Sequence, residues 1–302
     1  MIALLDALLA QTPAADVSGE AQINLVQAIV LGIVQGLTEF LPISSSAHLK
    51  VVPIALGWGD PGVAYTAVIQ LGSIVAVLWY FRKDLTTITF GAVEAVVRRD
   101  YKSQEFQLAL ALVLGTIPIL FFGLLIKRLI PDFDNSGLRS LGAIAIASIV
   151  MSLLLAIAEK IGTRHRTYEK LTVPDGILMG LAQAIALIPG CSRSGSTLTA
   201  GLFMGLERPA AARFSFLLGI PAITLAGLVE LNGALGEGIG DAGVAAFIVG
   251  TISAFVFSYL SIAWLMKFLQ TQNTWVFVWY RLAFGVAILT TLAVGQSTIF
   301  KR

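Results

Sequence analysis

Four ionisable residues lie inside stretches of this sequence that are otherwise almost wholly apolar: Glu39, His48, Lys50 and Arg193. A charged side chain in lipid is costly unless it is paired, hydrated or functional. Glu39 and Arg193 are therefore expected to form a structural ion pair, to serve a functional site, or to do both. His48 lies nine residues from Glu39 in the same polar segment and is expected to act with it. Lys50 is long enough to extend toward the membrane interface.

The residues around Arg193 suit a phosphate group. A guanidinium presents a planar fork of donors that matches phosphate oxygens, and neighbouring hydroxyls add further donors. These hydroxyls belong to Ser192, Ser194, Ser196 and Thr197. A helix that begins near Ser194 would also direct free backbone N–H groups and a positive dipole end at the ligand, and Ser44, Ser45 and Ser46 stand at the start of a second such helix. Two helix N-termini that face each other predict a site for a phosphate-like polyanion.

Gln35 and Glu39 are four residues apart, so on a helix they share one face and approach the same ligand. A carboxylate beside phosphate predicts that Glu39 binds a divalent cation, accepts a proton, or does both. The cation, Mg²⁺ or Ca²⁺, would be held weakly and partly by substrate phosphate. Ser45 or His48 is expected to supply the nucleophile and the other to transfer a proton, and the sequence does not choose between them.

The composition indicates the solvent in which these groups are held. Hydrophobic residues make up 57% of the 302 residues and charged residues only 13%, against about 25% in soluble domains. Six windows free of Asp, Glu, Lys and Arg approach or reach the roughly 20 helical residues that cross a bilayer. They are 62–81, 107–126, 140–158, 214–229, 242–266 and 282–300. The sequence thus predicts an all-α polytopic membrane protein, and a net charge of +2 without a long basic run argues against a nucleic-acid partner.

Two further apolar stretches, 21–38 and 176–192, each run into a proline and a cluster of hydroxyl residues. The prolines are Pro42 and Pro189. Polar, non-helical backbone at membrane depth survives only where it is buried in protein or lines a water-filled cavity. We therefore predict two re-entrant helical hairpins that enter the membrane without crossing it.

The two hairpin regions match each other at an offset of 147 to 148 residues, and the match continues into the crossings with a drifting offset. Matched pairs include Gly32 and Gly180, Gln35 and Gln183, Pro42 and Pro189, Gly72 and Gly219, Gly115 and Gly250, and Arg139 and Arg281. Each half, 21–158 and 174–300, then holds one hairpin and three crossings. Because three is odd, the second half is inverted relative to the first. The prediction is one membrane domain, 1–302, with a retained peripheral segment at 1–20.

The positive-inside rule orients this arrangement, because Lys and Arg gather in cytoplasmic loops. With the segment 82–102 inside, thirteen Lys and Arg residues lie on the cytoplasmic side and five outside. The cytoplasmic set includes Arg281, which precedes the last predicted crossing. The first hairpin then enters from the outer face and the second from the cytoplasm, so their tips are expected to meet near the midplane.

Two motifs carry a family resemblance. Residues 35–48 (QGLTEFLPISSSAH) closely resemble the first signature of the bacterial undecaprenyl-diphosphate phosphatase, or bacitracin-resistance, family, and residues 189–197 (PGCSRSGST) resemble its second. Residues 69–74, 114–118 and 214–221 also resemble family positions, so the likeness spans nearly the whole chain.

The resemblance implies an inverted-repeat enzyme of the bacterial inner membrane. Its reaction would be hydrolysis of undecaprenyl diphosphate to undecaprenyl phosphate and inorganic phosphate, which supports peptidoglycan synthesis and lowers bacitracin sensitivity. The implied roles are the essential acid for Glu39, nucleophile and acid/base for Ser45 and His48, phosphate clamp for Arg193, and phosphate contacts for Ser192 and Thr197. Gln35, where many members have Glu, lowers the negative charge of the site, and Ala47, where Gly is usual, narrows backbone freedom.

A transporter is the competing class. Inverted repeats with paired hairpins and an anion site at the midplane are typical of many secondary transporters as well. A flippase for a phosphorylated prenyl lipid would use Arg193 and the serines without needing His48 as an acid or base. The sequence leaves this choice to experiment, and it leaves open whether two copies form a homodimer.

Overall fold

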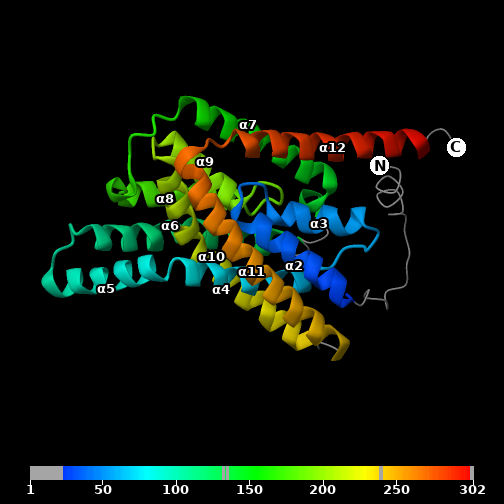
Figure 1. The fold of residues 1–302 in the computed structure, drawn as a ribbon, viewed down its shortest axis with the longest axis horizontal. Helices are drawn as coiled ribbons and strands as arrows, with labels where there is room; N and C mark the ends of the chain where they lie inside the picture. The colour runs from blue at the N-terminus through cyan, green and yellow to red at the C-terminus, as the bar shows by residue number, and fades with distance from the viewer. Residues whose placement is uncertain (1–22, 131–132, 134–135, 238–240, 300–302) are drawn as a thin grey trace.

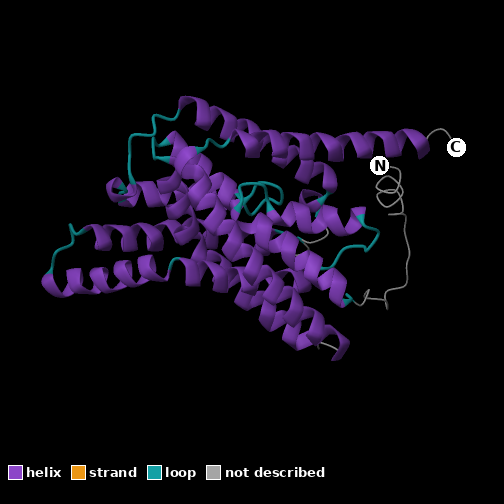
Figure 2. Cartoon of the chain, in the orientation of Figure 1, coloured by secondary structure: helices purple, strands orange, loops and turns teal. Residues whose placement is uncertain are grey.

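The computed structural model describes the chain except for residues 1–22, 131–132, 134–135, 238–240 and 300–302, so the predicted peripheral segment 1–20 lies outside the described residues. The described residues form one bundle of helices joined by loops and contain no strand, as predicted (Figure 1, Figure 2). The eleven α-helices of this part are α2 (Leu25–Phe40), α3 (Ser45–Ala55), α4 (Val63–Tyr80), α5 (Arg82–Arg98), α6 (Gln104–Leu129), α7 (Leu141–Ile161), α8 (Val173–Ile185), α9 (Arg193–Phe203), α10 (Arg208–Glu237), α11 (Asp241–Thr271) and α12 (Trp275–Ile299).

Each predicted hairpin is a pair of short helices, α2 with α3 and α8 with α9, separated by a turn that contains Pro42 or Pro189. Proline cannot continue a helix, because it lacks the N–H that the helix needs. In both turns a serine has positive φ, 78° at Ser44 and 67° at Ser192, a conformation that few residues other than glycine adopt. The Ser192 side chain then caps α9 by accepting a hydrogen bond from Gly195 N–H. The predicted helix breaks are confirmed.

Five helices of the described part are long and apolar enough to cross a membrane: α6, α7, α10, α11 and α12. Helices α4 and α5 pass the same test as a pair bent by 66°, which raises the count to six and agrees with the predicted number of crossings. The outward face of α6 carries Val113, Phe121 and Leu124, each more than half exposed. Apolar side chains on an outward face are suited to contact with lipid tails. Together with the number of apolar helices, they indicate a multi-pass membrane protein.

Most of the predicted cytoplasmic segment 82–102 is helical, because residues 82–98 form α5. Ile88 and Ala95 of α5 lie seven residues apart and are both buried. That spacing places them on one helical face, and α5 packs against α6. Packing against α6 therefore helps to stabilise a helix in a segment for which the sequence analysis predicted only a position.

Glycines allow helices from distant parts of the chain to approach closely. Helix α11 packs along α2, and α6 packs along α8 (Figure 1). A Cβ atom at Gly32 would lie 2.4 Å from the Gly250 carbonyl oxygen, and one at Gly180 would lie 2.0 Å from the Gly115 carbonyl oxygen. Any side chain at either position would force the two backbones apart, which is why small residues mark such membrane interfaces.

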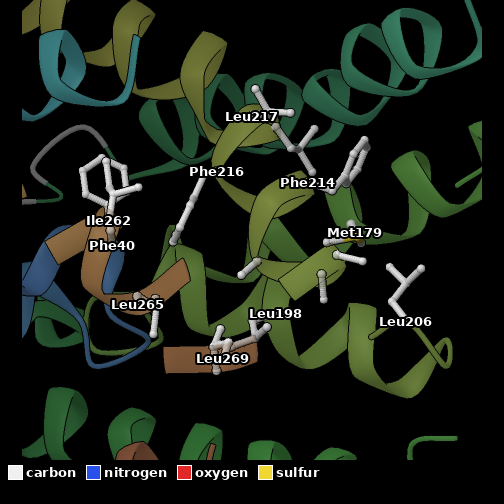
Figure 3. Close-up of a cluster of buried hydrophobic side chains, with 14 of the residues drawn as sticks. Phe40, Met179, Leu198, Leu206, Phe214, Phe216, Leu217, Ile262, Leu265 and Leu269 are labelled. Carbon is white, nitrogen blue, oxygen red and sulfur yellow. The ribbon is translucent and has the colours of Figure 1, made fainter. Parts of the chain in front are cut away.

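The end of α2 is anchored in the main apolar core. Figure 3 shows Phe40, Phe216 and Ile262 among the buried side chains that α2, α8, α9, α10 and α11 contribute to this core. Phe40 is fully buried and meets Phe216 edge to face at 5.3 Å between ring centroids. Because Phe40 directly follows Glu39, its packing fixes the carboxylate at the mouth of the first turn.

Candidate active site

Residues from both hairpin turns line a cavity of about 310 Å³. Its polar side chains are Gln35, Glu39, Ser44, Ser45, Ser46, Thr66, Gln70, Ser192 and Arg193, and its apolar ones are Leu49, Ala67, Ile119, Ala186, Ala222, Ile223 and Ala226. The polar set comes from α2, α4, the first residues of α3 and α9, and the two turns. The apolar set comes largely from α10 and from single residues of other helices. A cavity with these two kinds of wall suits an amphiphile that has an anionic head and an apolar tail.

Glu39 is the one carboxylate among the residues that line this cavity, and four side chains donate to it. Its Oε1 atom accepts from Arg193 Nη2 at 2.9 Å and from Gln70 Nε2 at 3.3 Å. Its Oε2 atom accepts from Ser45 Oγ at 2.6 Å and from Gln35 Nε2 at 3.1 Å. The two predicted hairpin tips therefore meet through a carboxylate and a guanidinium.

Arg193 is held in place by the backbone of α10. Its Nη1 atom donates to the Gly219 carbonyl oxygen at 2.9 Å, while Nη2 donates to Glu39. A Cβ atom at Gly219 would lie 2.4 Å from Nη1 and 2.9 Å from Cζ of Arg193. Glycine at position 219 is thus what allows the guanidinium to lie flat against α10 with its fork directed at the first turn.

His48 faces α12 and is absent from the residues that line the cavity. Its Nδ1 atom lies 2.7 Å from the Ser44 carbonyl oxygen, and its Nε2 atom lies 2.6 Å from the Tyr280 hydroxyl. A carbonyl oxygen only accepts, so Nδ1 carries the proton and Nε2 accepts from Tyr280. The ring also stacks on Phe284 at 4.4 Å between centroids. The structure therefore brings Ser45 to Glu39 but does not bring His48 to them.

The predicted phosphate-binding hydroxyls divide into two groups. Ser44, Ser45, Ser46 and Ser192 line the cavity. The other three point into the protein: Ser194 Oγ donates to the Leu41 carbonyl, Thr197 is hydrogen-bonded to the Ser215 hydroxyl, and Ser196 is buried without a hydrogen-bond partner among the described residues. These three residues belong to the first two turns of α9 and are buried on its interior side.

Several residues of the site escaped the sequence analysis. Gln70 lies in α4, 31 residues from the Glu39 that it contacts, and Tyr280 lies 232 residues from His48. Ser73 accepts from Gln35 Nε2 at 3.3 Å. Residues 69–74 resemble a family motif, which was the one available signal for Gln70 and Ser73. No local pattern pointed to Tyr280.

Lys50 and Arg281 differ in their surroundings: Lys50 reaches toward a loop, and Arg281 is buried within a helix. Lys50 Nζ donates to the Arg139 carbonyl at 2.9 Å, so it reaches toward the loop before α7, as expected of a long side chain. Arg281 is a correction: it was counted among the cytoplasmic loop cations, but it lies in the second turn of α12 and is only 1% exposed. The crossings were predicted as stretches free of charged residues. Such a definition puts every Lys and Arg outside a crossing, and therefore misplaces an arginine that is buried within a helix. The count becomes twelve inside against five outside.

The donor set suits at most a weakly held cation. Within the described residues no group of three or more His, Cys, Asp or Glu side chains could hold a metal ion. Glu39 offers carboxylate oxygen and Ser45 a hydroxyl oxygen beside it, whereas Gln35 and Gln70 direct their amide nitrogens at the carboxylate. Hard oxygen ligands fit Mg²⁺ or Ca²⁺, which would need phosphate oxygens to complete their coordination. The predicted cation thus stays a prediction.

Comparison with known proteins gives the family. The model of the bacitracin resistance protein BacA family matches residues 28–287. A protein of Trichormus variabilis named undecaprenyl-diphosphatase is 69% identical over 277 residues, which are 92% of this chain and 87% of the relative. A Synechocystis sp. protein of the same name is 67% identical over 282 residues, 93% of this chain and 86% of the relative. The chain belongs to the bacitracin resistance protein BacA family.

Proposed function

We propose that this membrane protein hydrolyses undecaprenyl diphosphate to undecaprenyl phosphate and inorganic phosphate. The observation that carries the proposal is the contact of Ser45 and Arg193 with the two oxygens of one carboxylate, Glu39, at a cavity with polar and apolar walls. The name of the relatives, undecaprenyl-diphosphatase, supports the same substrate. In a bacterial inner membrane this reaction returns the lipid carrier to cell-wall synthesis and confers bacitracin resistance.

The geometry favours Ser45 as the nucleophile and Glu39 as the base. Ser45 Oγ already donates to Glu39 Oε2 at 2.6 Å, the arrangement that activates a hydroxyl. Ser45 Oγ attacks the terminal phosphorus, its proton passes to Glu39, and the bond from that phosphorus to the bridging oxygen breaks. Glu39 gives the proton to the departing undecaprenyl phosphate. It then takes a proton from the water that attacks the phosphoserine, and returns it to Ser45 Oγ as phosphate leaves.

Stabilisation of the developing charge falls to the second turn and to the cation, when one is bound. Arg193 presents its fork beside Glu39, so a terminal phosphoryl group above Ser45 meets the guanidinium directly. The hydroxyls of Ser44, Ser46 and Ser192 line the same cavity and add neutral donors. Mg²⁺ or Ca²⁺ held by Glu39 and phosphate oxygens would neutralise part of the diphosphate charge.

For His48 the contacts support a positioning role. Its Nδ1–H donates to the carbonyl of Ser44, the residue with positive φ that precedes Ser45. This hydrogen bond holds the backbone in a conformation that serine adopts rarely, and the backbone in turn sets the direction of the Ser45 hydroxyl. His48 thereby contributes to the site through Ser44 and Ser45 and not through proton transfer.

We further propose that the two halves of the chain are inverted repeats and that both hairpins are re-entrant. Reciprocal contacts support the repeat: Gly32 of α2 meets Gly250, and Gly180 of α8 meets Gly115. Because Gly32 matches Gly180 and Gly250 matches Gly115, the repeat relates one contact to the other. Helix α2 thus packs on a helix of the other half, and α8 does the same in return. Helices α2 and α8 are each too short to span a bilayer alone, which supports re-entry.

Phosphate release tests the function. Purified protein in detergent is expected to release phosphate from a long-chain prenyl diphosphate, and Glu39→Gln is expected to lower kcat/KM by about 10² to 10⁴, the usual contribution of a positioned base. Lys127→Ala, an exposed change near the end of α6, is the control and should leave the rate unchanged. EDTA is expected to lower activity and Mg²⁺ or Ca²⁺ to restore it.

Two further measurements separate the alternatives. Acid quenching during turnover of substrate labelled in its terminal phosphate should trap a phosphoenzyme that Ser45→Ala removes; a label that persists in this variant would place the nucleophile elsewhere. Lipid binding with no phosphate release in any divalent-cation condition would identify a transporter or flippase instead. In cells, overproduction should raise bacitracin resistance, and overproduction of the Glu39→Gln protein should not.

A further inference from the structure

Arg281 is a fully buried cation that no carboxylate among the described residues pairs with. It is 1% exposed, and its guanidinium donates only to backbone carbonyl oxygens. The acceptors are Pro42 at 3.0 Å, Gly190 at 2.8 Å, Cys191 at 3.1 Å and Ser148 at 3.4 Å. A buried charge without an opposite charge is costly, so its presence at this position indicates a structural or functional role.

The four acceptors show what Arg281 joins. Pro42 belongs to the first hairpin turn, Gly190 and Cys191 belong to the second, and Ser148 belongs to α7. One rigid planar group on α12 therefore ties the two turns to each other and to the bundle behind them. The two hairpins are also joined by the hydrogen bond from Ser194 Oγ to the Leu41 carbonyl and by the ion pair of Arg193 with Glu39.

The residues that Arg281 holds stand next to the reacting groups. Pro42 lies three residues from Glu39 and three from Ser45, and Cys191 lies two residues from Arg193. We infer that Arg281 is a positioning residue of the active site, which keeps the carboxylate and hydroxyl of the first turn in register with the guanidinium of the second. The inference rests on the proposed function, because its kinetic readout is phosphate release.

Arg281→Lys separates geometry from charge. An ammonium keeps the positive charge near the site, but it is a compact point charge that cannot reproduce the planar fork spanning both turns. Since a misplacement of about 1 Å can cost about 10² in rate, kcat is expected to fall at least tenfold while KM changes less than about threefold. Arg128→Lys, an exposed arginine of α6 that touches neither turn, is the matched control and should behave as wild type.

Gly195→Ala provides a second perturbation that leaves Arg281 in the sequence. A Cβ atom at Gly195 would lie 2.7 Å from Arg281 Nη1, so the guanidinium must shift, and the variant should show the same loss of kcat in weaker form. Gly123→Ala is its control, because that Cβ meets only Leu187 Cδ2 at an ordinary 3.7 Å. The inference is overturned if both test variants keep kcat within twofold of wild type, or if KM rises while kcat does not fall.

Hydrogen exchange gives a readout that needs no catalysis. In detergent, peptides that cover 41–44 and 189–193 should take up deuterium faster in Arg281→Lys than in wild type, and both should change together. Arg128→Lys should leave both peptides unchanged. Unchanged exchange in Arg281→Lys overturns the inference. A wild-type protein that releases no phosphate would contradict the proposed function alone, since the exchange result would still decide whether Arg281 joins the turns.

Discussion

A single methyl group at position 219 should displace the phosphate-binding guanidinium without removing any charge. In Gly219→Ala the new Cβ would lie 2.4 Å from Arg193 Nη1, whereas ordinary contact begins at 3.4 Å, so Nη1 must move by about 1.0 Å (3.4 − 2.4). Arg193 Nη1 also donates to the carbonyl of Gly219 itself, so the side chain cannot keep that hydrogen bond and avoid the methyl group. Its Nη2 contact with Glu39, now 2.9 Å, should lengthen or break.

Displacement on this scale predicts a large kinetic effect with little loss of stability. A shift of about 1 Å in a positioning group can cost about 10² in rate, which corresponds to about 2.7 kcal/mol of transition-state stabilisation. Alanine favours a helix over glycine by about 1 kcal/mol, so part of the steric cost to α10 is offset. Gly219→Ala is therefore expected to lower kcat/KM about 100-fold while the protein stays folded.

Gly227→Ala is the matched control, because it makes the same change in the same helix. Its Cβ would meet only the flexible methyl groups of Ile74 and Leu71, each at 3.1 Å. Phosphate release from a prenyl diphosphate gives kcat and KM, and thermal unfolding in detergent shows that both variants fold. If folded Gly219→Ala keeps kcat/KM within threefold of wild type, the placement of Arg193 against α10 is irrelevant to catalysis and the reasoning fails.

Two more predictions follow from close contacts. Tyr280→Phe removes the hydroxyl that donates to His48 Nε2 and leaves that buried nitrogen unpaired; kcat should fall about tenfold for a lost hydrogen bond of about 1–3 kcal/mol, and an unchanged pH–rate profile would show that His48 positions and does not titrate in turnover. Gly180→Ala places a Cβ 2.0 Å from the Gly115 carbonyl and should destabilise the fold by about 1–3 kcal/mol. Thermal unfolding in detergent checks it against Gly137→Ala, whose Cβ meets nothing within 4 Å, and equal midpoints would contradict it.

The sequence predicted the groups that meet across the two turns because membrane burial makes them conspicuous. Glu39 and Arg193 are ionisable residues in apolar stretches. Pro42 and Pro189, in the turns that follow α2 and α8, mark the breaks beside them. The contact of Glu39 with Arg193 at 2.9 Å agrees with the expectation that the two hairpin tips meet. Chemical type, burial cost and helix breaking are local properties, and a sequence displays them.

Arg281 and α5 show where local reasoning stops. A search for charge-free windows treats a cation as the end of a crossing, so it cannot find an arginine whose charge is absorbed by carbonyl oxygens from three other segments. The cytoplasmic placement of 82–102 likewise gave no sign of α5, which is helical and packs against α6. The misplacement of Arg281 arises because the carbonyl groups that accept its hydrogen bonds lie far away in the sequence.

Matched positions in the two halves carry different chemistry. Gln35 donates to Glu39 and to Ser73, whereas Gln183, its match, is fully buried and has no hydrogen-bond partner among the described residues. Gly72 lets the α11 backbone approach α4, where a Cβ would lie 2.1 Å from the Thr251 carbonyl oxygen, while its match Gly219 admits a side chain. The proposed repeat would thus account for the scaffold and leave the site to divergence between the halves.

That divergence favours hydrolysis over transport. Two identical turns would offer a headgroup the same donors from both sides, which is sufficient to bind an anion and to release it on either side of the membrane. Here the first hairpin supplies a carboxylate hydrogen-bonded to a hydroxyl, and the second supplies a guanidinium. A base with a nucleophile on one side and an anion clamp on the other are what phosphoryl transfer requires, and neither is needed merely to carry a lipid across.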